Sequence, residues 1–106
     1  MTKRKADNRQ GEGIGVKDRQ RFERPKKYKV VLINDDYTPM SFVIALLMQQ
    51  FRMDEAKAKT ITLQVHEQGR GIAGVYTKEI ADTKALACRQ LAKQYEHPLL
   101  VEVQAE

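Results

Sequence analysis

Apolar and polar residues alternate in blocks after Lys27, and each block predicts one strand or helix. Tyr28 to Ile33 is a β-branched, apolar run that ends at the turn-forming residues 34–36, a pattern typical of a buried strand. Thr38 is then expected to be the N-cap of a helix that begins at Pro39, because proline has no N–H to satisfy at the first helical position. This helix is predicted to run to Phe51.

The apolar residues of this first helix lie on two faces, so it should pack against more than one neighbour. Its main stripe, at helical spacing, is Met40, Val43, Ile44, Leu47 and Phe51, and a second face carries Phe42 and Leu46. A second helix is predicted from roughly Glu55 to Gln68, with Asp54 as its N-cap and Gly69 as the residue that ends it. Its buried stripe would be Ala58, Ile61 and Val65.

The last third of the chain predicts a strand, a helix and a strand. Gly71 to Tyr76 is apolar and is followed by Thr77 as a further N-cap. His97 and Pro98 would stop the third helix, and residues 99–103 would form the last strand. The buried stripe of this helix is predicted to be Ile80, Ala87, Cys88, Leu91 and Tyr95. The order β-α-α-β-α-β predicts a small α+β domain in which a three-stranded antiparallel sheet packs against three helices.

Residues 1–27 differ from the rest of the chain. Past Met1 their large apolar residues are only Ile14, Val16 and Phe22, and they contain three glycines and many charges. Such a segment buries too little apolar surface to offset the entropy of ordering it, so we expect a disordered basic tail. Residues 28–106 would then form one domain.

The net charge of +5 lies in this tail. Residues 1–27 carry ten Lys or Arg against four Asp or Glu, whereas residues 28–106 carry nine against ten. An alternative function is therefore a small RNA-binding module that acts through its basic tail. Residues 70–76 even resemble the RNP1 motif of RNA-recognition domains. However, Ile72 and Gly74 stand where that motif has its base-stacking aromatic residues, and the near-neutral domain also argues against nucleic acid.

Several other classes are disfavoured by composition. Cys88 is the only cysteine, which excludes an internal disulfide and a Cys-rich zinc site and fits a reducing cytoplasm. The chain shows neither the apolar segment of a signal peptide nor a stretch near the roughly 18 apolar residues of a membrane span. Asp35, Asp36 and His66 are too few to predict a metal site. Because no nucleophile in these segments has a neighbouring base, we expect neither an enzyme nor a bound cofactor.

Two adjacent carboxylates directly after a buried strand need an explanation. A solvated turn is the simplest one. If the first two helices form a hairpin beside the first strand, Asn34 and Asp36 would instead meet His66, which shares one helix surface with Thr62 and Val65. These three polar side chains can all accept hydrogen bonds, so they would suit the ammonium group of a ligand with an apolar side chain.

Four motifs resemble the S-type adaptor of the Clp protease, the bacterial component that recognises N-degrons. They are N-D-D-Y-T-P-M at residues 34–40, V-H-x-Q-G at 65–69, G-V-Y-T-x-E-I-A-D-T-K at 74–84 and E-H-P-L-L at 96–100. The resemblance covers Tyr28 to about Val103. It implies a protein that binds substrate proteins by a free N-terminal Leu, Phe, Tyr or Trp and delivers them to the Clp AAA+ unfoldase. The adaptor itself would make or break no bond.

The resemblance also implies a role for individual residues. Asn34, Asp36 and His66 would contact the α-amino group, with Asp35 assisting, and Thr38 would hold the peptide backbone that follows. The side chain would enter a pocket in which Met40 blocks β-branched residues. The residues that would line this pocket are Met40, Val43, Thr62, Val65 and Leu99.

One position departs from the family pattern, because Thr62 stands where a methionine is expected. Its shorter, partly polar side chain should enlarge or reshape the pocket. Glu79 and Lys84 match the positions that dock on the N-terminal domain of the unfoldase. The tail would be the segment that the unfoldase pulls during delivery, and we expect the protein to be a monomer.

Overall fold

A computed structural model describes residues 25–106, and its elements follow the predicted order. They are β1 (Lys27–Ile33), α2 (Met40–Phe51), α3 (Glu55–Gln68), β2 (Arg70–Thr77), α4 (Lys78–Gln94) and β3 (Leu100–Ala105). The predicted tail lies outside the described residues except for its last three, and Lys27 already belongs to β1. The predicted fold class, an α+β domain with a three-stranded antiparallel sheet, is confirmed.

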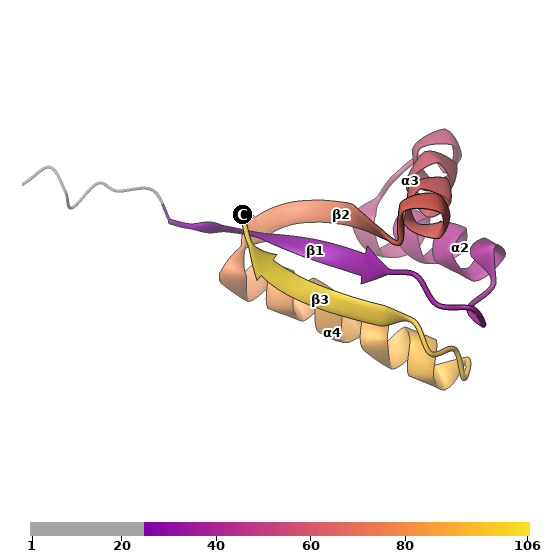
Figure 1. Ribbon diagram of the computed structural model, residues 1–106. Coiled ribbons are helices and arrows are strands. Elements are labelled where there is room, and N and C mark those ends of the chain that lie inside the picture. The colour runs from indigo at the N-terminus through magenta and orange to yellow at the C-terminus, as the bar shows by residue number, and fades with distance from the viewer. Residues whose placement is uncertain (1–24) are drawn as a thin grey trace, which may run out of the picture.

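The sheet has the order β2-β1-β3, so the most apolar strand is the central one. Val30 and Leu32 are fully buried and belong to the core, because α4 packs against β1. α4 runs along the sheet and contacts all three strands. α2 and α3 form a hairpin at the end of the sheet where β1 stops and β2 starts (Figure 1). This arrangement places the loop after β1 beside both helices of the hairpin.

The start of α2 corrects one prediction. Its N-cap is Pro39, whose carbonyl accepts hydrogen bonds from the N–H groups of Phe42 (3.1 Å) and Val43 (3.3 Å), and no side chain caps this helix. The prediction of Thr38 as the N-cap is therefore wrong. Its hydroxyl instead donates to the Asp35 carboxylate at 2.7 Å, because that carboxylate lies within reach of the turn.

Both ends of α3 are as predicted. The Asp54 side chain accepts from the N–H of Lys57 at 2.8 Å, which satisfies one of the free donors of the first turn. Gly69 ends the helix with φ of 89°, a left-handed conformation that glycine adopts without steric cost. Thr77 is likewise the N-cap of α4 by position, although its side chain makes no capping bond.

The buried face of α4 differs from the predicted stripe. Its buried residues are Ala81, Ala85, Cys88 and Ala92, whereas Ile80 and Tyr95 are exposed. The prediction followed the large side chains, but three alanines let the helix lie close against the sheet. Of the predicted stripe, Cys88 is fully buried, while Ala87 and Leu91 are partly buried and Leu91 packs against the core. Which face of α4 is buried depends on how closely the helix can pack against the sheet, because protein interiors are close-packed.

Candidate functional site

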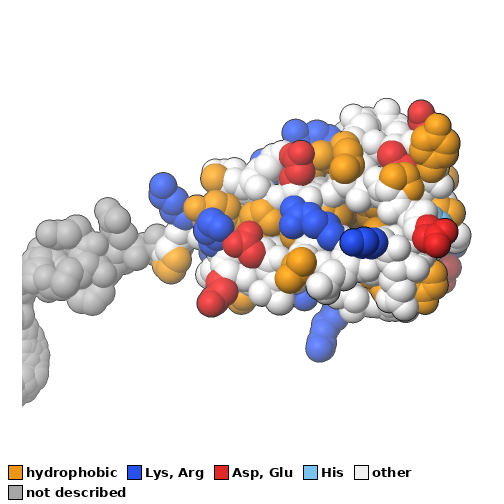
Figure 2. Space-filling model, turned by 90° about the horizontal axis from the view of Figure 1, so that it is seen from below, with side chains coloured by type: hydrophobic (Ala, Val, Ile, Leu, Met, Phe, Trp, Pro, Cys, Tyr) orange, Lys and Arg blue, Asp and Glu red, His pale blue; other side chains and the backbone are white. Residues whose placement is uncertain are grey.

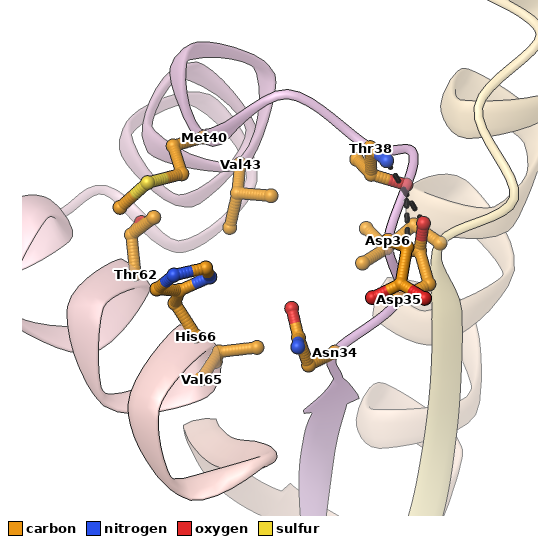
Figure 3. A pocket seen from close by; sticks show the side chains of 10 residues that line it. Asn34, Asp35, Asp36, Thr38, Met40, Val43, Thr62, Val65 and His66 are labelled. Atoms are coloured by element: carbon orange, nitrogen blue, oxygen red, sulfur yellow. Dashed lines mark hydrogen bonds between the residues drawn. The ribbon is translucent and has the colours of Figure 1, made fainter.

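A cavity of about 180 Å³ lies where the loop after β1 meets α2 and α3. It is lined by the ten residues that the sequence predicted for an amine site and its pocket (Figure 3). These are Asn34, Asp35, Asp36, Thr38, Met40, Val43, Thr62, Val65, His66 and Leu99. The structure thus brings together three stretches that are far apart in the sequence, residues 34–43, residues 62–66 and Leu99.

The loop is fixed to α3 at its first residue. The N–H of Asn34 donates to the carbonyl of Gly69 at 3.0 Å, directly after the last turn of α3. Asn34 therefore lies beside the turn that carries His66. In Figure 3 the side-chain amide of Asn34 points into the cavity and the His66 ring faces it from the helix. This backbone contact could not be predicted from the sequence.

The two neighbouring carboxylates are in different environments. Asp35 accepts three hydrogen bonds within the loop, from the N–H of Tyr37 (2.8 Å), the N–H of Thr38 (2.8 Å) and the hydroxyl of Thr38 (2.7 Å). Partial burial alone would raise the pKa of Asp35, but these bonds and the nearby His97 hold the pKa below its ordinary value of 3.8. The carboxylate is therefore ionised at neutral pH and holds the loop in shape.

Asp36 has no such partner. Its carboxylate is exposed, and no hydrogen bond to it is found among residues 25–106. An ionised carboxylate has about four acceptor sites, so Asp36 keeps all of them for a ligand while Asp35 keeps about one. Thr38 has used both of its donors on Asp35, and its hydroxyl oxygen remains as an acceptor.

The inner wall of the cavity is apolar. Val43, Val65 and Leu99 are buried side chains, while Met40 is 39% exposed at the mouth. Thr62 is the one polar residue that is buried in the described part of the chain, with 2% exposure. Its hydroxyl donates to the carbonyl of Ala58 at 2.7 Å, one turn earlier in α3. This bond satisfies the hydroxyl hydrogen within the helix, so a threonine is tolerated in an apolar wall.

Glu79 and Lys84 lie outside this cavity, on α4. Glu79 is exposed in the first turn. The Lys84 ammonium donates to the carbonyl of Gln50 at 2.8 Å and lies 5.7 Å from the ring centre of Phe51 and 5.6 Å from that of Tyr76. Lys84 therefore ties α4 to the end of α2, a contact that the sequence did not reveal.

The described residues contain one buried thiol. Burial raises the pKa of the Cys88 thiol to about 11, so it is protonated at neutral pH and is a weak nucleophile. Between residues 25 and 106, no three His, Cys, Asp or Glu side chains are grouped so that they could hold a metal ion. None of the helices described is long and apolar enough to cross a membrane.

This chain is similar to proteins of one known family. A family model described as "ATP-dependent Clp protease adaptor protein ClpS" matches residues 23–102. A protein of that name from Hydrogenovibrio crunogenus is 46% identical over 86 residues, which is 81% of this chain and 83% of the relative. Another from Methylococcus capsulatus is 44% identical over 96 residues, which is 90% of this chain and 91% of the relative.

A solved structure is also similar to this fold. It is that of Agrobacterium tumefaciens ClpS2 bound to L-phenylalaninamide, with a TM-score of 0.76 and 40% sequence identity. The match covers 78% of this chain and 100% of the other.

Proposed function

Because this chain belongs to the ClpS family of adaptors of the ATP-dependent Clp protease, which are not enzymes, we propose that its cavity binds the N-terminal residue of substrate proteins. The substrates would carry a free, bulky hydrophobic residue, Leu, Phe, Tyr or Trp, at the N-terminus. The adaptor would then deliver them to the Clp unfoldase in the cytoplasm.

The observation that carries this proposal is an unengaged carboxylate at the mouth of an apolar cavity. An α-amino group has a pKa of roughly 7.7 to 8.0, so it is mostly cationic at neutral pH and offers three donors. Asp36, Asn34 and His66 would accept them. Asp35 would act chiefly by holding the loop, with about one acceptor site left for the amine.

The size of the cavity favours a bulky side chain. An apolar cavity of about 150 Å³ can hold a benzene molecule, and this one has about 180 Å³. The ligand of the similar Agrobacterium protein, L-phenylalaninamide, carries a benzyl group beside a free amine. Burying such a side chain contributes about 1.5–3 kcal/mol, and a charge-assisted hydrogen bond contributes about the same. Together, less the entropy of association, they would support micromolar binding, about −8 kcal/mol.

The direction of the bound chain follows from the loop. The free acceptor on Thr38 suits the N–H of the second substrate residue, so the peptide would leave the cavity over Thr38. Met40 at the mouth would restrict branching at the β-carbon of the first residue. Glu79 would contact the N-terminal domain of the unfoldase, and Lys84 would fix the shape of that surface through its bond to α2.

A titration with peptides that differ only in their first residue tests the proposal. Leu, Phe, Tyr and Trp peptides are expected to bind in the micromolar range by fluorescence anisotropy, and Ile and Val peptides much more weakly. Acetylation of the same peptides removes the charge and two of the three donors, and it should weaken binding at least tenfold. Equal affinity for free and acetylated peptides would rule out an amine site.

A further inference from the structure

A second recess lies beside the first cavity, between the end of α4 and the start of β3. Its lining includes Tyr37, Ala92, Pro98 and Leu100, and it shares Leu99 with the first cavity. In the loop after β1, Asp36 and Thr38 line the first cavity whereas Tyr37 lines the second. The loop therefore forms a ridge between two neighbouring recesses, and the buried Leu99 lies beneath both of them.

The floor of this recess is apolar and its rim has mixed charge. Ala92 and Leu99 are buried beneath it, while the side chains of Tyr37 and Leu100 are exposed above them. The cations at the rim are Arg89 and Lys93, and Glu96 is beside them.

Arg89 is already engaged, because it donates two hydrogen bonds to the carbonyl of Val101, at 3.0 and 2.6 Å. Figure 2, seen from the side of β3 and α4, shows basic, acidic and apolar side chains interspersed rather than one charged area. The recess therefore suits an apolar side chain better than an anion.

We propose that this recess binds the side chain of the third residue of the substrate, with a preference for an apolar one. The inference rests on the proposed function, since it needs a chain end in the first cavity and an exit over Thr38. In an extended chain, successive side chains point to opposite sides, so residues 1 and 3 face the same surface. They are roughly 7 Å apart along the chain. A third residue would thus cross the ridge and face the recess, whereas the second would face solvent.

The test uses the full chain and three peptides with N-terminal Phe. One has serine at positions 2 and 3, one has Leu at position 2, and one has Leu at position 3. Half-burial of a Leu side chain corresponds to about a fivefold gain in affinity. The expected result is this gain for Leu at position 3 and none for Leu at position 2.

Two variants locate the gain. In the Leu100→Ala variant, the peptide with Leu at position 3 should bind about as tightly as the peptide with serine there, so the ratio of their affinities should fall to about one. Leu86→Ala is the matched control, because Leu86 is exposed to a similar extent, 52% against 55% for Leu100, and lines neither recess. The ratio should persist in this control.

The outcomes separate the two proposals. If no Phe peptide binds, the proposed function itself fails. If all three bind equally, the first cavity stands and the second recess is not a substrate site, which leaves it to another occupant such as the unfoldase. A gain at position 3 that Leu100→Ala retains would also overturn the inference, because it would arise elsewhere on the surface.

Discussion

Replacement of Asp36 by alanine is the most direct perturbation of the amine site. The side chain is exposed and accepts no hydrogen bond from residues 25–106, so its loss should leave the fold unchanged. Asp35, one position earlier, keeps the loop in shape through three hydrogen bonds. Asp36→Ala therefore removes a charge from the mouth of the cavity while the rest of the site stays in place.

The size of the effect follows from the bond that is lost. A hydrogen bond to a charged group contributes about 1.5–3 kcal/mol, and each 1.4 kcal/mol is a factor of ten in affinity. The expected weakening is therefore about 10-fold to 150-fold. Because the carboxylate is exposed, solvent screening favours the lower part of this range. A peptide that binds the wild type with a Kd of about 1 μM would then bind this variant with a Kd of about 10 μM or higher.

The assay is a fluorescence anisotropy titration with a labelled Leu-initiated peptide, together with thermal unfolding of each variant. Asp82→Ala is the control, since it removes an exposed carboxylate that pairs with Lys78 on α4, away from the cavity. It should bind the peptide as the wild type does. Unchanged affinity of Asp36→Ala, with its melting temperature also unchanged, would refute the assignment of Asp36 to the amine.

Three further perturbations test other parts of the site. His66→Ala should weaken binding of the Leu peptide, because it removes one of the three acceptors assigned to the ammonium; unchanged affinity would remove His66 from the site. Asp35→Ala should lower the free energy of unfolding by about 1 kcal/mol at pH 7. Because the folded pKa of Asp35 lies below 3.8, this difference in stability is present at neutral pH and is lost as the pH falls through the folded pKa. Urea unfolding of both proteins at pH 7 and pH 3 would measure it. A difference that stays the same at both pH values would contradict the role of the Asp35 carboxylate in holding the loop. Gly71→Ala would place a Cβ atom 2.8 Å from Cγ2 of Val65, so we expect a loss of about 1–3 kcal/mol in stability. Peptide binding should also weaken, because Val65 lines the cavity. Unfolding and binding identical to the wild type would show that β2 does not pack this closely on α3.

All ten residues that line the cavity were named from the sequence, most of them through the resemblance to the Clp adaptors. The apolar run of β1 and the polar residues after it predicted where a loop with two adjacent carboxylates would lie. The motifs then resembled those of the Clp adaptors, and the family comparison confirmed this resemblance. The difference between Asp35 and Asp36 could not be read from the sequence, because it depends on which of two adjacent side chains turns back onto the loop.

Local patterns were sufficient where structure depends on near neighbours in the chain. Asp54 and Gly69 were placed correctly at the ends of α3, since a cap bonds to groups within one turn. The order of strands and the bond from Asn34 to Gly69 join segments that are remote in the sequence, and the buried face of α4 depends on contact with all three strands at once. The sequence by itself thus determined the elements and the chemistry of the candidate residues. Only tertiary packing decided which of those residues share one cavity, because distances between remote segments are set by how the helices and sheet fill space together.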